Sequence, residues 1–243
     1  MATFTSTETG SIVGTVSRLW RYPVKSMAAE PLESAEVSWA GVAGDRRWAF
    51  VRPGAERNDF PWYTIREYPL MCRYAPRLID PERPDKSEVE VRTPGGPTLR
   101  VHDPALAAEL GPGVRVIRLG RGTFDAMPLS LITTQTVSGL CELTQVPDNE
   151  LRFRPNVVVT ATDDRSFVED EWVGSVLQVG DALVRLDARD TRCTVVNVDP
   201  ETGRPTGQLL KTIGQQRQAR AGVYGTIVRP GLIRLNDSVR VIR

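Results

Sequence analysis

The chain has 243 residues, of which 40% are hydrophobic and 25% are charged, so it can bury a large core and is too apolar to be disordered as a whole. Its 31 basic and 30 acidic residues leave a formal net charge of +1, which excludes the strong overall positive field typical of nucleic-acid-binding chains. The single histidine, His102, stands at the expected start of a surface helix, which argues against a histidine-based catalytic triad; one histidine excludes multi-histidine metal sites, and three cysteines are too few for a disulfide framework.

Short runs rich in β-branched and aromatic residues alternate with turn residues along the chain, as expected of many short strands. The predicted strands are Ser11–Trp20, Ala35–Ala40, Arg46–Arg52, Val89–Thr93, Val114–Leu119 and Asn156–Ala161. Three helices are predicted, at Pro104–Leu110 with Asp103 as N-cap, at Gln135–Leu143 with Thr134 as N-cap, and at Gln208–Gln215. Strands outnumber helices, so the predicted fold class is mainly β with accessory helices, of the β-barrel or sandwich type.

The connections between these elements change character near the middle of the chain. Before residue 122 the predicted strands are linked mostly by turns, with long proline-containing connections at 53–72 and 79–88. After it, helices and strands alternate. We therefore place a boundary near Arg121–Asp125, which divides the chain into regions 1–122 and 123–243.

Two polar motifs predict contacts with an anion. In YPVKSM, Lys25 offers a charge with three donors and Ser26 a hydroxyl, so this turn is suited to a phosphate, and the alternative is an ordinary solvated lysine. In GDRRW, Arg46 and Arg47 are expected to face opposite sides of a strand. One of them would point inward to an anion, or else pair with Asp45.

A third motif, RFRPNVVV, places polar residues at the start of a run that is expected to be buried on both faces. Arg154 supplies a bidentate fork for an anion, and Asn156 supplies a donor and an acceptor for the edge of a heterocycle. The alternative is a strand start whose polar groups are satisfied by local hydrogen bonds.

Cys193 is the cysteine with the most informative surroundings, because Arg192 adjoins it and Arg185 and Arg189 lie close upstream. Positive charge favours the thiolate, which is a nucleophile or a ligand for a soft metal. The alternative is a buried structural cysteine that precedes a strand at 194–198. The residue pattern leaves both interpretations open.

Five motifs, YPVKSM, GDRRW, FRPNVVV, EDEWVGSVLQVGD and TRCTVVNVDPETG, stand in the order and spacing of the MOSC family. The chain resembles the bacterial relatives of the mitochondrial amidoxime-reducing components. The resemblance implies a MOSC β-barrel preceded by an N-terminal β-barrel-like region, and it implies the molybdenum cofactor, Mo-molybdopterin, with Cys193 as the molybdenum ligand. The cofactor-binding residues that it implies are Lys25, Ser26, Arg46, Asp125, Arg154, Asn156, Thr191, Arg192 and Tyr224.

At Asp125 the family has a short polar run, whose hydroxyls are lost here at Ala126 and Met127, so only backbone contacts are expected there. The implied activity is the reduction of N-hydroxylated substrates by oxygen transfer to molybdenum. No cysteines remain for an iron–sulfur domain, so the electrons are expected from a separate ferredoxin-like or b-type-cytochrome-like protein with its reductase.

Two other functions remain alternatives at this point. One is a sulfur-carrier or cofactor-delivery protein that uses the same cysteine. The other is a β-barrel binding module that uses its C-terminal arginines, against which the absence of interleaved aromatic residues argues. Neither a secretory signal nor a membrane-spanning stretch is evident, so we expect a cytoplasmic protein without a membrane partner. The near-neutral charge argues against a nucleic-acid partner, and the lack of a long unpaired apolar stripe favours a monomer.

Overall fold

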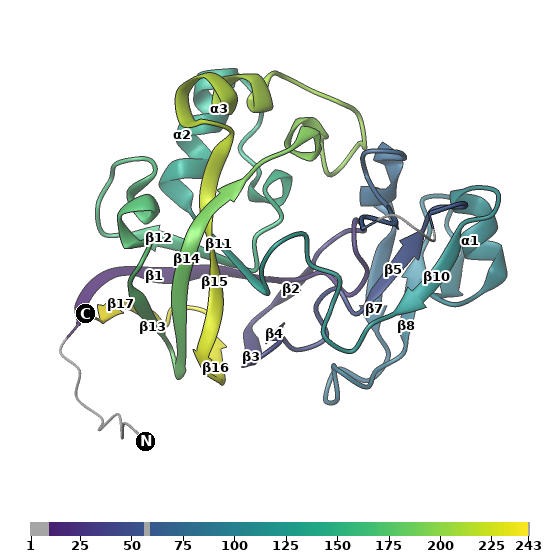
Figure 1. Cartoon of the computed structure of the whole chain (residues 1–243), viewed down its shortest axis with the longest axis horizontal. Coiled ribbons are helices and arrows are strands. Elements are labelled where there is room, and N and C mark those ends of the chain that lie inside the picture. The colour runs from purple at the N-terminus through teal and green to yellow at the C-terminus, as the bar shows by residue number, and fades with distance from the viewer. Residues whose placement is uncertain (1–9, 56–58, 243) are drawn as a thin grey trace.

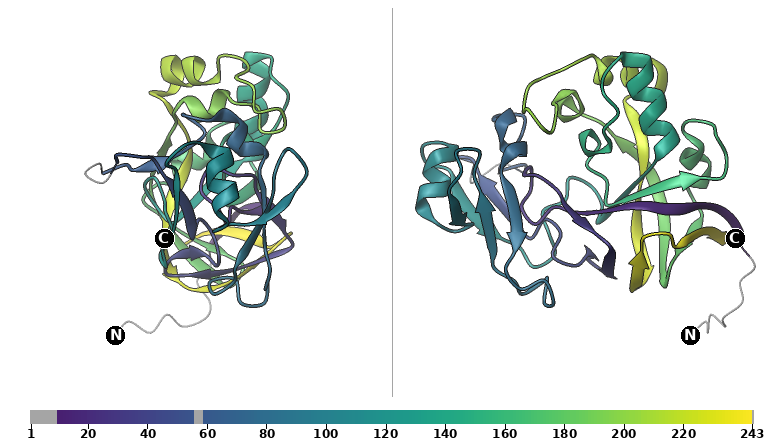
Figure 2. Two further views of the ribbon diagram at one scale, coloured as in Figure 1. Left: turned by 90° about the vertical axis from the view of Figure 1, so that its right-hand side faces the viewer. Right: turned by 180° about the vertical axis from the view of Figure 1, so that it is seen from behind.

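The structure is a computed structural model and describes residues 10–55 and 59–242. Two units lie side by side, a β-barrel flanked by helices and a smaller group of short sheets (Figure 1). The further views in Figure 2 show the same two units from the side and from behind. The predicted mainly β fold class is confirmed.

The barrel is one continuous sheet that closes on itself. The strands follow the order β12-β11-β15-β14-β13-β17-β1, and β12 also pairs with β1. The pairing of β11 with β12 is parallel, and the other pairings in the barrel are antiparallel. The strand bounds are β1 (Ser11–Arg21), β11 (Leu129–Thr133), β12 (Val157–Ala161), β13 (Val176–Val179), β14 (Ala182–Thr191), β15 (Arg220–Arg229) and β17 (Ser238–Ile242), and β2 (Glu30–Leu32) extends the sheet beside β1.

In the part of the chain that the structure describes, three smaller sheets of three strands each complete the β structure. The first comprises β10 (Arg115–Arg118), β5 (Trp48–Val51) and β6 (Trp62–Tyr63). The second comprises β7 (Ala75–Leu78), β8 (Val89–Arg92) and β9 (Thr98–Arg100). The third, β16 (Gly231–Arg234), β3 (Ser34–Ser38) and β4 (Gly41–Val42), packs at the base of the barrel.

Helices cover the ends and sides of these sheets. The α-helices are α1 (Pro104–Leu110), α2 (Thr134–Thr144) and α3 (Leu209–Arg217). Short 3-10 turns are η1 (Pro69–Arg73), η2 (Glu150–Arg152), η3 (Val168–Trp172) and η4 (Thr194–Asn197). Within the described residues, none of the helices is long and apolar enough to cross a bilayer.

The hydrophobic cores join segments that are far apart in the sequence. Val16 of β1 and Val37 of β3 belong to the same buried cluster as Leu131 and Val184 of the barrel. A second cluster fills the smaller unit around Phe50 and includes residues from both halves of the chain. The strands that precede residue 123 therefore supply part of the barrel, and both of these clusters combine residues of regions 1–122 and 123–243.

Most predicted elements are present, with local differences. Asp103 caps α1 by accepting a hydrogen bond from the Ala105 amide. The cap of α2 is Thr133, one residue before the predicted Thr134, because the Thr133 hydroxyl accepts the amide of Thr136. The predicted strand at 194–198 is wrong, because residues 194–197 form the η4 turn directly after Cys193.

The predicted strand at 46–52 begins only at Trp48. Arg46 has a φ of 49°, in the left-handed region, so it lies in a turn and the argument from alternating strand faces does not apply to it. Arg46 lines a pocket, whereas Arg47 is buried beside Asp85. The Arg47 Nε donates a hydrogen bond to the Asp85 carboxylate at 2.9 Å.

Candidate functional site

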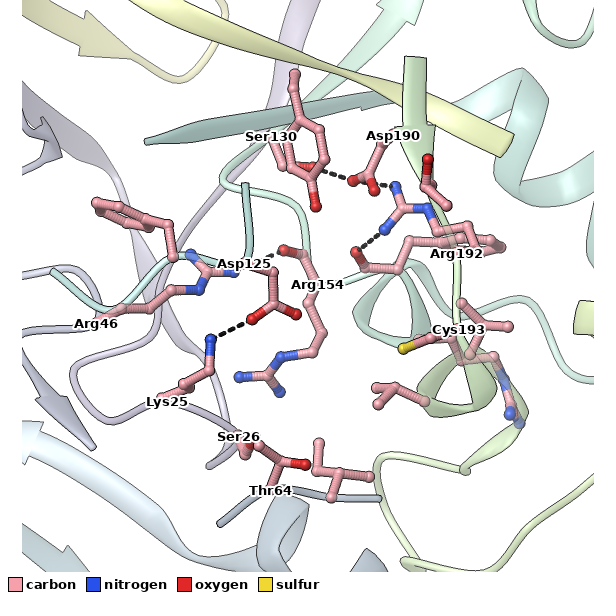
Figure 3. A pocket seen from close by; sticks show the side chains of 18 of the residues that line it. Lys25, Ser26, Arg46, Thr64, Asp125, Ser130, Arg154, Asp190, Arg192 and Cys193 are labelled. Carbon is pink, nitrogen blue, oxygen red and sulfur yellow. Dashed lines mark hydrogen bonds and ion pairs between the residues drawn. The ribbon is translucent and has the colours of Figure 1, made fainter. Parts of the chain in front are cut away.

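A pocket lies where the two units meet (Figure 3). Its wall combines the turn after β1, the turn before β5, the loop after β6, the connection into β11, the segment between η2 and β12, and the end of β14. All the site residues proposed from the sequence lie in this wall: Lys25, Ser26, Arg46, Asp125, Arg154, Asn156, Thr191, Arg192, Cys193 and Tyr224.

Two turns on one side of the pocket are held against each other by main-chain contacts. The Arg46 amide donates to the Tyr22 carbonyl at 2.6 Å, and the buried Asp45 carboxylate accepts the Tyr22 amide at 2.7 Å. Ser26 and Arg46 both have positive φ, of 68° and 49°. Such conformations cost about 1 to 3 kcal/mol in a residue with a side chain and are found at ligand sites, where the surrounding contacts maintain them.

Lys25 is buried rather than solvated, with an exposed fraction of 6%, so the alternative of an ordinary surface lysine is wrong. Its Nζ donates to the Thr123 carbonyl at 2.6 Å and forms an ion pair with Asp125 (Figure 3). Burial lowers the pKa of Lys25, and the adjacent Asp125 carboxylate opposes that shift. The Thr123 carbonyl and the Asp125 carboxylate therefore hold the Lys25 ammonium at the pocket wall.

The buried ring of Tyr22 supports two arginines. The guanidinium carbon of Arg46 lies 4.5 Å from the ring centroid and that of Arg154 lies 4.3 Å from it, both within the range of cation–π attraction. Arg46 also forms an ion pair with Asp45 and donates to the Arg154 carbonyl at 3.0 Å. Of the two alternatives for this motif, the pairing of Asp45 with a neighbouring arginine is present, and Arg46 also lines the pocket.

Arg154 differs from the other basic residues of the wall, because it has no acidic partner among the described residues. One of its terminal nitrogens, Nη2, is buried without a hydrogen-bond partner. Burial lowers the pKa of Arg154, and the Tyr22 ring opposes that shift. In Figure 3 its guanidinium reaches into the pocket between Lys25 and Cys193.

Asn156 is occupied by the protein itself. Its Oδ1 accepts the Ser130 amide at 3.3 Å, and its Nδ2 donates to the Trp20 carbonyl at 3.2 Å. The amide thus ties β1 to the start of β11 and β12. The polar groups at this strand start are satisfied within the protein, as the alternative interpretation expected, but the partners are distant in the sequence rather than local.

Arg192 connects three segments next to the cysteine. Its Nε donates to the Ala221 carbonyl at 2.7 Å, its Nη1 donates to the Phe153 carbonyl at 2.6 Å, and its Nη2 lies 2.8 Å from the Asp190 carboxylate. Burial raises the pKa of Asp190, while the Arg192 charge opposes the shift, and Ser130 donates a hydrogen bond to it at 3.1 Å. This network positions the end of β14, where Cys193 follows.

The Cys193 thiol faces the pocket and is partly exposed, unlike the buried thiols of Cys72 and Cys141. The alternative of a buried structural cysteine is therefore wrong. The basic group beside the sulfur is Arg66, whose Nη2 lies 3.4 Å from Sγ. The arginines expected there from the sequence pair elsewhere, Arg185 with Asp187 and Arg189 with Asp170.

Several residues of the wall were not proposed from the sequence. Arg66 comes from the smaller unit, 127 residues before Cys193, and no spacing signal links the two. Asp190 lies three positions before Cys193 and could have been considered from that proximity. Tyr22, which lies under two arginines of the wall and not in the wall itself, was missed as their platform, although it belongs to the YPVKSM motif.

The charges of the wall favour an anionic ligand. Four basic residues have acidic partners, in the pairs Lys25–Asp125, Arg46–Asp45, Arg152–Asp199 and Arg192–Asp190. Arg154 remains without one, and Arg66 shares Asp125 at 3.7 Å. Across residues 10–55 and 59–242, no group of three or more His, Cys, Asp and Glu side chains is arranged to hold a metal ion.

Residues 13–121 match the family model of the MOSC N-terminal beta barrel domain, and residues 122–240 match that of the MOSC domain. The chain belongs to the MOSC family. Over 95% of its length it is 23% identical to the human mitochondrial amidoxime-reducing component 1, of which it covers 83%. Over 86% of its length it is 24% identical to the molybdenum cofactor sulfurase of Danio rerio, of which it covers 31%.

Among solved structures, the chain is similar to the YUAD protein from Bacillus subtilis, with a TM-score of 0.53 and 12% sequence identity. The match covers 95% of this chain and 96% of that one. At this identity the similarity establishes a shared fold and carries no information on substrates.

Proposed function

We propose that this MOSC protein binds the molybdenum cofactor through Cys193 and reduces N-hydroxylated compounds. The observation that carries the proposal is the pairing of a partly exposed thiol with an arginine, Arg154, that has a buried and unpartnered Nη2 in the same pocket. An unpaired buried guanidinium is costly unless a ligand supplies the missing acceptor. A cofactor that carries both a metal and a phosphate satisfies both groups.

The residues of the pocket fit such a cofactor in distinct ways. Lys25, Ser26 and Arg154 offer an ammonium, a hydroxyl and a guanidinium, which are the donors that a phosphate takes. Cys193 offers a thiolate, a soft ligand that suits molybdenum, as it suits other soft metals. Arg192 and Asn156 are engaged by main-chain groups, so their role in this proposal is to position the wall rather than to donate to the cofactor.

When bound, the cofactor would supply the two-electron redox chemistry and accept the substrate oxygen. In the overall reaction an N-hydroxyl group takes up two electrons and two protons. The N–O bond breaks, one proton adds to the nitrogen, and the other joins the leaving hydroxyl group to form water. The electrons come from a separate redox protein. Tyr224 retains its phenol proton, because burial and then the Asp190 carboxylate raise its pKa, so it can act as a hydrogen-bond donor in the wall.

The relatives support this reading. Several are mitochondrial amidoxime-reducing components that match more than 90% of this chain, whereas the sulfurases match it over a third or less of their own length. An amidoxime is an N-hydroxylated group, so the names of the first set agree with the proposed substrate class. A cytoplasmic location and a monomeric state are part of the same proposal.

The proposal is tested by the molybdenum content per chain, measured by elemental mass spectrometry on protein from a host that makes the cofactor. Wild type is compared with Cys193→Ala and with Cys141→Ala, whose thiol is buried away from the pocket. We expect near-stoichiometric molybdenum in wild type and Cys141→Ala, and none in Cys193→Ala. Reduction of a hydroxylamine with a chemically reduced dye as electron donor should follow the same order.

Equal molybdenum and equal activity in Cys193→Ala would refute the role of this cysteine. Wild-type protein without molybdenum, from a host with a demonstrably active cofactor pathway, would refute the enzyme and favour a sulfur carrier. In that case mass spectrometry would show a persulfide on Cys193.

A further inference from the structure

Asp125 places a carboxylate inside the pocket, against the cations that an anionic ligand would use. One of its oxygens forms an ion pair with Lys25 Nζ, and the other lies 3.7 Å from Arg66 Nη2. The Asp125 side chain is about half exposed, at 47%, whereas the Lys25 side chain is 7% exposed. The carboxylate thus approaches a buried cation from the open side of the pocket.

Two of the three hydrogen-bond donors of Lys25 Nζ are directed to protein groups. An ammonium has three N–H donors. One is directed to the Thr123 carbonyl and one to Asp125, so a single donor is left for a ligand. A phosphate that contacts Lys25 must either take the place of the carboxylate or lie beside it, and two like charges at contact distance repel strongly in a partly buried site.

We propose that Asp125 competes with the phosphate of the ligand for Lys25 and Arg66, and thereby sets how tightly the pocket holds an anion. The inference rests on the proposed function only for the identity of that anion. Asp125 belongs to the segment 121–128, which has neither helix nor strand, and this leaves its side chain able to turn toward solvent. Lys25, held by the Thr123 carbonyl, stays in place when the carboxylate leaves.

The role departs from the backbone contact that the family resemblance implied at this position. A hydroxyl here would donate to a phosphate, whereas the ionised carboxylate only accepts hydrogen bonds. Despite partial burial, which acts in the opposite direction, Lys25 and Arg66 hold the pKa of Asp125 below its usual range. The group is therefore negative at neutral pH.

The test uses inorganic phosphate as the probe and the full chain, purified from a host that cannot make the cofactor. Phosphate affinity is measured by isothermal titration at constant ionic strength for wild type and Asp125→Asn, which removes the charge at nearly constant size. The matched control is Asp85→Asn. The Asp85 side chain is also 47% exposed and pairs with a buried cation, Arg47, but it lies outside the pocket wall.

We expect Asp125→Asn to bind phosphate about tenfold more tightly than wild type, and Asp85→Asn to bind it as wild type does. In the background of Lys25→Gln the gain from Asp125→Asn should shrink. Unchanged or weaker binding by Asp125→Asn overturns the proposal, and so does an equal gain in Asp85→Asn, which would show a general effect of net charge. If Asp125→Asn does not fold, Asp125→Ala provides the same test, because alanine removes the charge and adds no hydrogen-bond donor.

A second measurement separates this inference from the proposed function. Molybdenum retained per chain after prolonged dialysis is compared between wild type and Asp125→Asn, both from a host that makes the cofactor. Higher retention in the variant supports both proposals together. If neither protein holds molybdenum while Asp125→Asn still gains phosphate affinity, Asp125 competes with anions as proposed and the molybdenum function is wrong.

Discussion

Replacement of Arg192 by methionine tests whether this residue is a structural clamp beside Cys193. Methionine keeps much of the apolar volume of the side chain and removes every donor. Two charged hydrogen bonds to main-chain carbonyls, at 2.7 and 2.6 Å, are lost together with the ion pair to Asp190. The Arg192 side chain is 7% exposed and that of Asp190 is 2% exposed, so solvent screens these interactions weakly.

The magnitude follows from what is left behind. Breaking a buried ion pair by removing one partner costs about 3 to 5 kcal/mol, because the other charge stays buried and uncompensated. We expect Arg192→Met to lower the free energy of unfolding by about that amount. Arg192→Lys should lower the free energy of unfolding by less than Arg192→Met does, because an ammonium can replace one or two of the contacts of the planar guanidinium but not all of them. Asp190→Asn combined with Arg192→Met should be less destabilising than the sum of the two single changes, by about 1 to 3 kcal/mol.

The assay is urea denaturation followed by tryptophan fluorescence, for which the chain has five tryptophans. Asp187→Asn, which removes the partner of the exposed Arg185, is the control and should lose less than about 1 kcal/mol. A loss below about 1 kcal/mol in Arg192→Met, or strict additivity with Asp190→Asn, would show that the clamp reasoning is wrong.

Three further predictions concern stability. Burial raises the pKa of Glu169 above its ordinary value of 4.5, so the folded state holds a proton that the unfolded state releases. The free energy of unfolding should therefore fall as pH rises from about 4.5 through the raised pKa. Glu169→Gln should flatten this pH dependence, as measured by thermal unfolding at a series of pH values. In urea denaturation, Asp199→Asn should lower the free energy of unfolding more than Arg152→Met does. The reason is that only Asp199→Asn leaves the fully buried Arg152 guanidinium without its charged partner, and the reverse order would contradict this reasoning. Gly41→Ala should lower the melting temperature, because its φ of 85° strains a side chain and the new Cβ would collide with the Pro128 carbonyl; an unchanged value would mean that the turn relaxes freely.

Arg154 and Lys25 show how far local sequence patterns led toward the site. Each was proposed from a short motif that placed a basic residue beside a predicted turn or buried strand, and both lie in the wall of one pocket. The motifs gave no reason for the difference between them. Lys25 has Asp125 as a partner and Arg154 has none, and this difference depends on which carboxylates the fold brings within reach.

For Arg46, the rule that neighbouring strand residues face opposite sides was wrongly applied, although the residue it singled out does line the pocket. Strand alternation predicted that Arg46 and Arg47 face opposite ways, but Arg46 lies in a left-handed turn before the strand starts. The turn depends on contacts with Tyr22 and Asp45 that only form when β1 lies beside it. Propensity therefore could not distinguish this turn from the first residue of a strand.

By itself, the sequence determined the mainly β class, the helix at 104–110 with its cap, and the buried run of β12, because these depend on propensities and spacings within a few residues. The tertiary structure decided that β1 closes the barrel against β12 and that Arg66 lies beside Cys193. Those contacts join positions more than a hundred residues apart. Their free energy comes from burying surfaces that meet only in the folded chain, and no local periodicity records which surface meets which.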